Sequence, residues 1–337
     1  MEKTIGVLLI GAGRAGMIHG RNFATAVPGA KLVAISDVFE EGVKAAAAEL
    51  NVEDWYTDYQ EALKNPKVDA VAIATPTGLH KQIVIDCANA GKDIFCEKPM
   101  APTVEDCDEM IEACEKNNVK LQIGFIRRFD ASFMKAKEYL DTGKAGRMVE
   151  MISKTHGPST PKEWMYDIEK SNGPLAEVGS HDIYTLLWFT GAHAASVYTV
   201  GGNYRCPEAK EKYPDFYDTA LMTIKFDNGM IGLVDVAQGV KYGYDAQADI
   251  LCEHGLVHAG DLRDVSAQMY TADGRESGVS TKWIEVFTGA YLREDIAFIE
   301  ALRGERECEP TGQMGREVIS IIKAGNESLK TGKIVEL

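Results

Sequence analysis

Apolar and polar residues follow a βα rhythm through the first 124 residues of the chain. Short apolar runs of strand length recur, and amphipathic patterns with the period of an α-helix separate them. The apolar runs lie at residues 4–10, Lys31–Ser36, Asp69–Ala74, Asp93–Phe95 and Lys120–Gly124. The helical patterns lie at residues 14–26, Glu40–Leu50, Tyr59–Lys64, 78–90 and Thr103–Asn117. Strands that alternate with helices predict a parallel sheet of the Rossmann type.

The pattern changes after residue 124. One helical stretch runs to about Leu140, and strand-type runs then dominate from Arg147 onward. These runs lie at residues 148–155, 195–201, 217–226, 230–238, 246–252 and 265–271, and helical stretches at Ala290–Arg303 and Thr311–Lys330 end the chain. Asp227-Asn228-Gly229 stands between two of the runs and predicts a hairpin. We expect an open, mostly antiparallel sheet that serves substrate binding or contact between subunits.

These patterns predict an α/β protein with two domains. An N-terminal Rossmann dinucleotide-binding domain would span residues 1–124, and a C-terminal α+β domain with a large open sheet would span residues 125–337. The length agrees, because 337 residues exceed what one hydrophobic core usually serves. We expect a homo-oligomer, a dimer or a tetramer, formed through the C-terminal sheet.

Composition and charge narrow the range of partners. A net charge of −15 argues against nucleic acid, which clustered Lys and Arg must neutralise. The seven cysteines lack C-x-x-C spacing and most lie in apolar surroundings, which favours reduced, buried thiols. No apolar stretch approaches the length of a membrane span, and no H-E-x-x-H metal motif occurs. We therefore expect a cytoplasmic enzyme with no membrane partner and no metal.

A glycine motif with G-x-G-x-x-G spacing follows the first apolar run. It comprises Gly11, Ala12, Gly13, Arg14, Ala15 and Gly16. The first glycine permits a tight turn, the second lets the backbone approach a pyrophosphate, and the third lets helix pack on strand. Asp37 closes the next strand, where a carboxylate can accept hydrogen bonds from a ribose 2′-hydroxyl and would repel a 2′-phosphate. The motif therefore predicts NAD in preference to NADP.

A second loop should also contact the cofactor. Loops at the carboxyl ends of parallel strands form the ligand crevice of such sheets, and this loop follows the run Asp69–Ala74. Its candidate cofactor contacts are Thr75, Pro76, Thr77 and His80. For His80 we favour capping or packing over a chemical role.

One helical pattern interrupts the strand-rich half, from Pro174 to about Thr190. Proline in the first turn and glycine past the end are typical of a helix start and stop. On a continuous helix Glu177, His181, Tyr184 and Trp188 would share the face opposite the apolar stripe. The spacing fits a Glu–His pair in a cleft, but taken alone it favours a surface Glu–His pair with the flanking aromatic residues packed elsewhere.

Phe95-Cys96-Glu97-Lys98-Pro99-Met100 stands where an apolar run ends and a helical segment begins. With its companion motifs, this turn resembles the glucose–fructose oxidoreductase/inositol dehydrogenase (Gfo/Idh/MocA) family, nicotinamide enzymes that oxidise ring alcohols. The inositol dehydrogenases are the most similar members, and the resemblance spans nearly the whole chain. Its motifs are Gly11–Gly16, Asp37, Glu97-Lys98-Pro99, Arg127–Asp130, His156, Gly173–His181, Tyr242–Asp245, Glu294–Ala301 and Thr311–Gly315.

The resemblance implies roles for particular residues. Lys98, Glu177 and His181 match the catalytic set of the family, and Glu97 and Lys98 would lie beside the cofactor. His181 would act as the base, Glu177 would orient it, and Lys98 would donate to the substrate oxygen. The resemblance also implies a cis bond between Lys98 and Pro99, and a cleft between the two domains that holds nicotinamide and substrate. Residues expected to line the substrate pocket are Arg127, His156, Glu177, His181, Tyr184 and Tyr244.

Two departures keep the substrate open. Glu177 replaces the usual aspartate of the family, and Tyr184 stands where inositol enzymes often have an acid. The leading expectation is oxidation of inositol to inosose. A sugar or glycoside oxidised at a ring hydroxyl such as C3 is the alternative, because a bulky aromatic wall would suit a less uniformly polar ligand. A dinucleotide-sensing regulator without turnover is a third possibility, which the presence of a proton relay disfavours.

Overall fold

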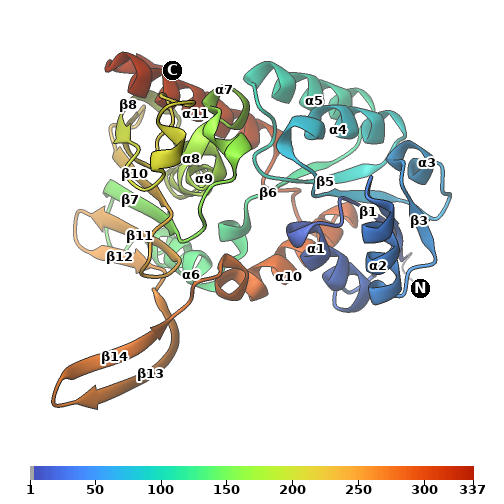
Figure 1. Ribbon diagram of the computed structural model, residues 1–337, viewed down its shortest axis with the longest axis horizontal. Helices are drawn as coiled ribbons and strands as arrows, with labels where there is room; N and C mark the ends of the chain where they lie inside the picture. Colours follow the sequence, from blue (N-terminus) through green and yellow to red (C-terminus); the bar gives the residue numbers. More distant parts are fainter. Residues whose placement is uncertain (1–3) are drawn as a thin grey trace. The chain divides into compact units, whose positions relative to one another are not determined.

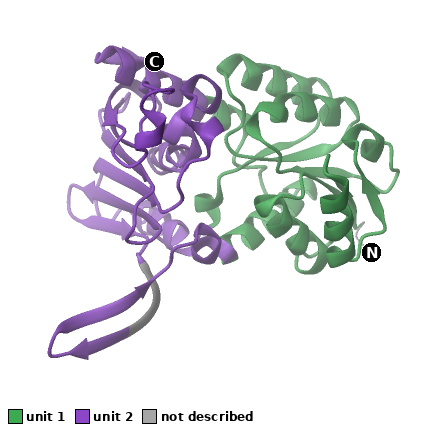
Figure 2. Cartoon of the chain, viewed as in Figure 1, with its two compact units in different colours: residues 1–129, 289–317 green, residues 130–288, 318–337 purple. Residues whose placement is uncertain are grey.

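The computed structural model describes residues 4–337, and the side chains of all of these except 263–267. The chain forms two compact units (Figure 2). Unit 1 comprises residues 1–129 and 289–317, and unit 2 comprises residues 130–288 and 318–337. The sequence predicts one boundary near residue 124, whereas the chain returns to unit 1 near its end. The chain returns because residues near its end pack in the hydrophobic core of unit 1.

Unit 1 is built on a six-stranded sheet with the order β3-β2-β1-β4-β5-β6. All its neighbouring strands are parallel, which confirms the predicted Rossmann sheet. The strands are β1 (Ile5–Ile10), β2 (Ala30–Ser36), β3 (Asp54–Tyr56), β4 (Ala70–Ile73), β5 (Asp93–Glu97) and β6 (Leu121–Gly124). The helices and turns are α1 (Arg14–Thr25), α2 (Glu40–Leu50), α3 (Tyr59–Leu63), η1 (Thr77–Leu79), α4 (His80–Asn89), α5 (Val104–Lys116) and η2 (Ile126–Phe129).

The core of unit 1 draws on both ends of the chain. Strand residues such as Val7 and Phe95 are fully buried, and Phe298 and Ile299 pack in the same cluster. The latter two belong to α10 (Trp283–Leu302), a helix coloured orange in Figure 1. The helix closes the sheet core, so residues 289–317 belong to the nucleotide-binding unit.

Unit 2 contains a seven-stranded sheet with the order β12-β11-β7-β10-β9-β8-β15. Its neighbours are antiparallel except for the parallel pair β7 and β10, which confirms a mostly antiparallel sheet. The strands are β7 (Met148–Gly157), β8 (Ala194–Gly202), β9 (Thr219–Phe226), β10 (Ile231–Gln238), β11 (Asp245–Cys252), β12 (Leu256–Ala259) and β15 (Val335–Glu336). A separate ribbon pairs β13 (Arg263–Thr271) with β14 (Gly274–Val279). The predicted hairpin at residues 227–229 joins β9 to β10.

The helices of unit 2 lie between and after these strands. They are α6 (Ala131–Asp141), η3 (Glu163–Tyr166), α7 (Ile168–Ser171), α8 (Gly173–Glu177), α9 (Gly179–Thr190), η4 (Pro207–Ala209) and α11 (Gly312–Thr331), the last of which begins in unit 1. Helix α9 packs against β7 and β10.

The two faces of the seven-stranded sheet differ in how far their side chains are buried. Along β9, Ala220, Met222 and Ile224 are buried while the residues between them are exposed. The register of the strands places several partly exposed apolar residues on the face opposite α9. They are Tyr198, Val200, Leu221, Ile231 and Leu251. Because strand side chains alternate, one face forms the core of unit 2 and the other presents these side chains outward.

Candidate active site

The glycine loop of unit 1 has the shape that a pyrophosphate site requires. Gly11 adopts φ +95°, and a Cβ there would lie 2.6 Å from the Ala74 carbonyl oxygen. A Cβ on Gly16 would lie 1.9 Å from the carbonyl oxygen of Gly11, so helix and loop can approach only through glycine. A Cβ on Gly13 would meet nothing within 4 Å. The backbone is therefore tightly packed at Gly11 and Gly16, whereas the space beside Gly13 is free of protein atoms and could admit a phosphate.

The amino end of α1 is suited to an anion. Gly13 caps the helix without a side-chain hydrogen bond, and the first turn carries no acidic residue. The backbone N–H groups of the first turn and the positive end of the helix dipole therefore face no carboxylate of the helix itself. Ala12, Arg14 and Ala15, predicted in the same motif, flank this position. The loop and helix fit the phosphates of a dinucleotide.

Asp37 lies beside the glycine loop, as the spacing predicts. Its Oδ2 accepts a hydrogen bond of 2.8 Å from the Ala12 N–H, and its Oδ1 accepts one of 2.9 Å from the Phe39 N–H. These bonds fix the carboxylate at the carboxyl end of β2. Val38 is 89% exposed and Phe39 66% exposed, so apolar surface adjoins this carboxylate. The arrangement fits a ribose with its base beside it.

The loop after β4 is tied to the turn after β5 by His80. This residue is buried, with Nε2 2.9 Å from the Thr75 carbonyl oxygen and Nδ1 3.0 Å from the Pro99 carbonyl oxygen. Burial lowers the pKa of His80. The ring thus joins two loop backbones, in agreement with the packing role favoured for His80, and its contact with the cofactor stays a prediction. The Thr75 hydroxyl is buried without a hydrogen-bond partner among residues 4–337, whereas Pro76 and Gly78 are exposed and Thr77 is partly exposed.

Glu97 and Lys98 differ in their environment. Glu97 is 8% exposed; its Oε2 accepts a 3.0 Å hydrogen bond from the Lys98 N–H, and its Oε1 lies 3.1 Å from His19 Nε2. Burial raises the pKa of Glu97. The hydrogen bond and charge of His19, together with the charge of Lys98, lower this pKa by more than burial raises it, so the net shift is downward. The Glu97 carboxylate is thus bonded within unit 1, and its contact with the cofactor stays a prediction. Lys98 is partly exposed, and the Lys98–Pro99 bond is cis, as expected.

The helix predicted from Pro174 to Thr190 is broken. Helix α8 ends at Glu177 and α9 begins at Gly179, and Val178 between them has φ −113° and ψ −42°. A Cβ on Gly179 would lie 3.0 Å from Val236 Cγ1 of β10, so the chain here runs close to the sheet. The prediction of one continuous helix was wrong. Glu177 and His181 lie on either side of the break, and both are partly exposed.

A buried carboxylate next to His181 anchors α9 to the sheet. Asp182 is fully buried and accepts hydrogen bonds from the Ser153 and Thr155 hydroxyls of β7 at 2.7 and 2.6 Å. These bonds fix the first turn of α9, which carries His181. Sequence reasoning missed Asp182, although two hydroxyl residues alternating in a strand and an acid in an apolar helix were available as signals.

Tyr184 does not form the exposed wall that helical phase predicts. Its side chain is 1% exposed, and its ring stacks on Trp188 with centroids 6.5 Å apart. The expectation assumed that the uncovered face of a continuous helix would meet solvent. Most residues on every side of α9 are buried, so the face that carries Tyr184 is covered as well. Tyr184 is therefore not a surface residue of unit 2, and its contact with a substrate stays a prediction.

The other predicted substrate residues lie in different places. A Cβ added to Gly157 would lie 4.0 Å from both the Tyr244 ring and Val178, which places Tyr244 near the α8–α9 break. His156 lies on the face of the sheet opposite α9, where Nε2 is 2.8 Å from Asp235 Oδ1 and Nδ1 contacts the Tyr242 hydroxyl. The structure thus brings Tyr244 toward the break but does not place His156 with it. Arg127 belongs to unit 1 and is fully buried.

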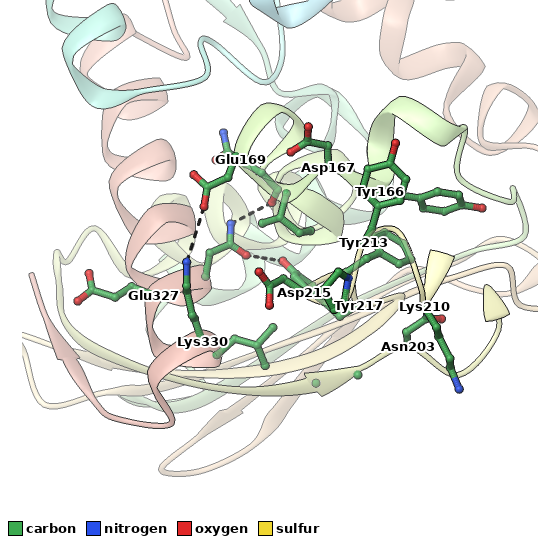
Figure 3. A pocket seen from close by; sticks show the side chains of 18 of the residues that line it. Tyr166, Asp167, Glu169, Asn203, Lys210, Tyr213, Asp215, Tyr217, Glu327 and Lys330 are labelled. Atoms are coloured by element: carbon green, nitrogen blue, oxygen red, sulfur yellow. Dashed lines mark hydrogen bonds and ion pairs between the residues drawn. The ribbon is translucent and has the colours of Figure 1, made fainter. Parts of the chain in front are cut away.

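A cavity of about 830 Å³ in unit 2 contains none of the predicted site residues. Figure 3 shows its aromatic wall, formed by Tyr166, Tyr213 and Tyr217. Several of its polar groups bind one another: the Tyr217 hydroxyl donates to Asn326 Oδ1 at 2.7 Å, and Lys330 pairs with Glu169 at 3.9 Å. This cavity is separate from the groups that carry the predicted chemistry.

Metal ligands and membrane spans were also sought. Within residues 4–337, no group of three or more His, Cys, Asp or Glu side chains is arranged to hold a metal ion. All seven cysteines are free thiols, and all but Cys308 are buried, as predicted. Across the described part of the chain, no helix is both long and apolar enough to span a bilayer.

Comparison with known proteins identifies the family. Residues 5–125 match the oxidoreductase family with an NAD-binding Rossmann fold, and residues 133–258 match the GFO/IDH/MocA C-terminal domain. The chain is 32% identical to the scyllo-inositol 2-dehydrogenase (NAD(+)) of Bacillus subtilis, over 100% of this chain and 97% of that protein. It is also 32% identical to the myo-inositol 2-dehydrogenase of Thermotoga maritima, over 98% of this chain and 97% of that protein.

A solved structure agrees with these sequence relatives. The scyllo-inositol dehydrogenase of Lactobacillus casei, crystallised with NAD(H) and scyllo-inositol, superposes with a TM-score of 0.91. It is 26% identical in sequence, and the match covers 99% of each chain. From the glycine loop, Asp37 and these matches together, the protein belongs to the GFO/IDH/MocA oxidoreductase family and carries an NAD-binding Rossmann domain.

Proposed function

We propose that this protein is an NAD-dependent dehydrogenase that oxidises a ring secondary hydroxyl of a cyclic polyol to a ketone. Inositol, converted to inosose, is the proposed substrate. The observation that carries the proposal is the full-length similarity to two relatives named as inositol 2-dehydrogenases. The Lactobacillus casei structure, which holds both NAD(H) and scyllo-inositol, supports the same substrate class.

Three features of unit 1 have a geometry that fits NAD: the glycine loop, the amino end of α1 and the Asp37 carboxylate. The open glycine loop and the α1 amino end would bind the pyrophosphate, and Asp37 would bind the ribose. The buried Thr75 hydroxyl is a further candidate donor, since a partner for it is lacking in the described residues. When bound, NAD supplies the acceptor for the hydride that leaves the substrate carbon.

Proton transfer would depend on His181. Its imidazole would take the hydroxyl proton as hydride leaves the carbon that bears this hydroxyl. The bonds between Asp182 and β7 hold the helical turn on which the imidazole stands. Glu177 would orient the imidazole. Lys98 would donate to the hydroxyl oxygen and stabilise the negative charge that develops there.

Tyr244 is the substrate-binding candidate in unit 2 that the geometry supports best. Its ring lies near Val178, between Glu177 and His181 in the sequence. An aromatic ring can cover the apolar C–H face of a cyclic polyol while charged side chains bind its hydroxyls. We retain Arg127 and His156 as weaker candidates, because one is fully buried and the other lies on the opposite face of the sheet.

The structure gives little support to a sugar or glycoside as the substrate. This alternative depended on Tyr184 as a bulky wall, and that side chain is buried. Glu177, one methylene longer than the aspartate usual in the family, is the remaining reason to test sugars and glycosides.

We also propose a homo-oligomer in which the uncovered sheet face of unit 2 is the contact, because its outward apolar side chains would otherwise face water.

The test is a substrate panel with the purified protein. It should contain myo-inositol, scyllo-inositol, glucose and a methyl glucoside, each with NAD and followed by the absorbance of the reduced cofactor. We expect turnover with an inositol to exceed turnover with glucose or the glucoside. His181→Ala serves as the negative control for each substrate. A higher kcat/KM with the glucoside would establish the alternative, and no reduction with any member would refute the proposed reaction.

A further inference from the structure

A cluster of ionisable side chains is buried directly behind the Glu97–Lys98 turn. At its centre lies His19 of α1, fully buried, with Nδ1 2.6 Å from Asp295 Oδ1 and Nε2 3.1 Å from Glu97 Oε1. The three side chains come from α1, β5 and α10, elements far apart in the sequence (Figure 1). One imidazole therefore bridges two carboxylates inside unit 1.

The surroundings favour a charged imidazole. Burial alone would lower the pKa of His19, but the charges and hydrogen bonds of Asp295 and Glu97 outweigh it and raise that pKa well above its ordinary value. Burial raises the pKa of Asp295, whereas the charge and hydrogen bond of His19 oppose that rise, as does the Asn22 amide, which donates to Asp295 at 2.7 Å. Both ring nitrogens then donate, which requires the imidazolium form.

The remaining neighbours of His19 are uncharged. The rings of Phe95 and Tyr291 lie 4.8 and 5.4 Å from its ring. Glu294, next to Asp295 on α10, is fully buried, and neither of its carboxyl oxygens has a hydrogen-bond partner in the described part of the chain. Burial raises the pKa of Glu294 well above its ordinary value, which favours the neutral form of this carboxyl group. The carboxyl groups that bond to His19 are thus Glu97 and Asp295.

The cluster leads by an unbroken chain of hydrogen bonds to Lys98. Asn22 donates to Asp295, Asp295 accepts from His19, His19 donates to Glu97, and the second oxygen of Glu97 accepts from the Lys98 N–H at 3.0 Å. The three central side chains, His19, Glu97 and Asp295, are buried, whereas Asn22 and Lys98 at the two ends are partly exposed. The backbone at Lys98 is therefore tied, through one imidazolium, to two helices of unit 1.

We propose that His19 is a positioning residue for Lys98. Held by Asp295, it fixes the Glu97 carboxylate, which fixes the backbone of Lys98 and so the place from which the ammonium reaches the substrate oxygen. The inference rests on the proposed function in one respect, namely that Lys98 acts on a substrate hydroxyl. A buried ion pair contributes little net stability, because the free-energy cost of desolvating both charges offsets their Coulomb attraction. Its use here is better explained by the precision that proton and hydride chemistry needs.

The proposal predicts a specific pattern of kinetic change. His19→Gln keeps a polar side chain but cannot bond both carboxylates as a cation. We expect kcat for the polyol to fall roughly 10- to 100-fold, the scale of a misplaced catalytic group. The dissociation constant for NAD, measured by fluorescence titration, should change less than about threefold, because the glycine loop and Asp37 are untouched. Asp295→Asn, which can still accept from His19, should show a smaller loss of kcat.

A double-mutant cycle separates positioning from general structural damage. If His19 acts through Lys98, His19→Gln should lower kcat by less than about threefold in a Lys98→Ala background. Independent damage would instead lower kcat by the same factor in both backgrounds. Equal factors would overturn the proposal. Should His19→Gln fail to fold, the same cycle is run with Asp295→Asn, and equal factors there would overturn it as well.

A matched control comes from unit 2. His258 also bonds an aspartate, with Nδ1 2.6 Å from Asp249 Oδ1, but the pair is exposed. His258→Gln should leave kcat, KM and NAD binding unchanged. If it lowers kcat as much as His19→Gln does, loss of any His–Asp pair would suffice and the proposal falls.

One readout does not depend on turnover and so separates this proposal from the proposed function. Acetylation of the Lys98 amine, measured by mass spectrometry relative to other lysines, can be compared in the unmodified protein and in His19→Gln. Without His19, the Glu97 carboxylate can pair with the Lys98 ammonium, so we expect Lys98 to be acetylated severalfold more slowly. An unchanged or faster rate would refute positioning. If no polyol is oxidised yet acetylation slows, the proposed function fails and the positioning stands.

Discussion

Replacing Asp37 is the sharpest test of the cofactor site. In the Rossmann arrangement its carboxylate binds the ribose, while the structure shows it holding the Ala12 and Phe39 N–H groups. Hydrogen bonds to a charged group contribute roughly 1.5–3 kcal/mol each, and about 1.4 kcal/mol corresponds to a tenfold change in affinity. Losing the charge should therefore weaken NAD binding by roughly 10- to 100-fold.

Two replacements at this position distinguish the charge from the loop contacts. Asp37→Asn keeps an oxygen that can accept from Ala12, whereas Asp37→Ala removes both backbone contacts. Because each also removes the repulsion of a 2′-phosphate, we expect the ratio of kcat/KM for NAD over NADP to fall at least about tenfold in both variants. Asp37→Ala should in addition bind NAD more weakly than Asp37→Asn. The assay is initial rate with each cofactor at saturating polyol.

Asp69 provides the control for Asp37. Its Oδ2 also accepts a backbone N–H hydrogen bond, from Gly6 at 2.9 Å, but at the amino end of the parallel sheet. Asp69→Asn should leave the cofactor ratio unchanged. An unmodified enzyme that uses NADP as well as NAD would refute the reasoning, and so would an Asp37→Asn variant with an unaltered ratio.

Three further outcomes are expected. His181→Ala should lower turnover by roughly 10²–10⁴-fold while leaving NAD affinity nearly unchanged, and near-normal turnover would remove histidine from the mechanism. Asp182→Ala, which leaves two strand hydroxyls without their acceptor, should lower the free energy of unfolding by roughly 3 kcal/mol in urea titrations, and a change below about 1 kcal/mol would contradict its role as an anchor. Because Tyr184 is buried, Tyr184→Phe should leave the ratio of inositol to glucoside activity unchanged, and a marked shift in that ratio would show that the ring reaches the substrate.

The sequence was sufficient for the features that local pattern determines. Parallel strands alternating with helices, the hairpin at residues 227–229 and the glycine loop each depend on residues close together in the chain. Asp37 was found for the same reason, since its distance from the glycines is set by one helix and one strand. These predictions needed only periodicity and the special backbone freedom of glycine.

Features that depend on distant residues could not be predicted in this way. The break at Val178 is marked by no proline, and the close approach of Gly179 to Val236 of β10 appears only once the sheet has formed. The bridge from His19 to Asp295 joins residues 276 positions apart. No periodicity connects them, and His19 alone is an ordinary residue in a helix. Helical phase also does not predict the burial of Tyr184, because the rest of the fold covers α9 on nearly every side.

The way in which the C-terminal part of the chain completes unit 1 has a consequence for evolution and engineering. Phe298 and Ile299 share a core with Phe95, so a gene fragment ending near residue 129 would encode a sheet with part of its apolar surface uncovered. Exchange of the nucleotide-binding module between relatives at a single junction would combine one parent's β5 with the other parent's α10. Recombination should therefore be tolerated best when residues 289–317 are inherited together with residues 1–129. The module that evolution can transfer is thus discontinuous in the gene although it is compact in the protein.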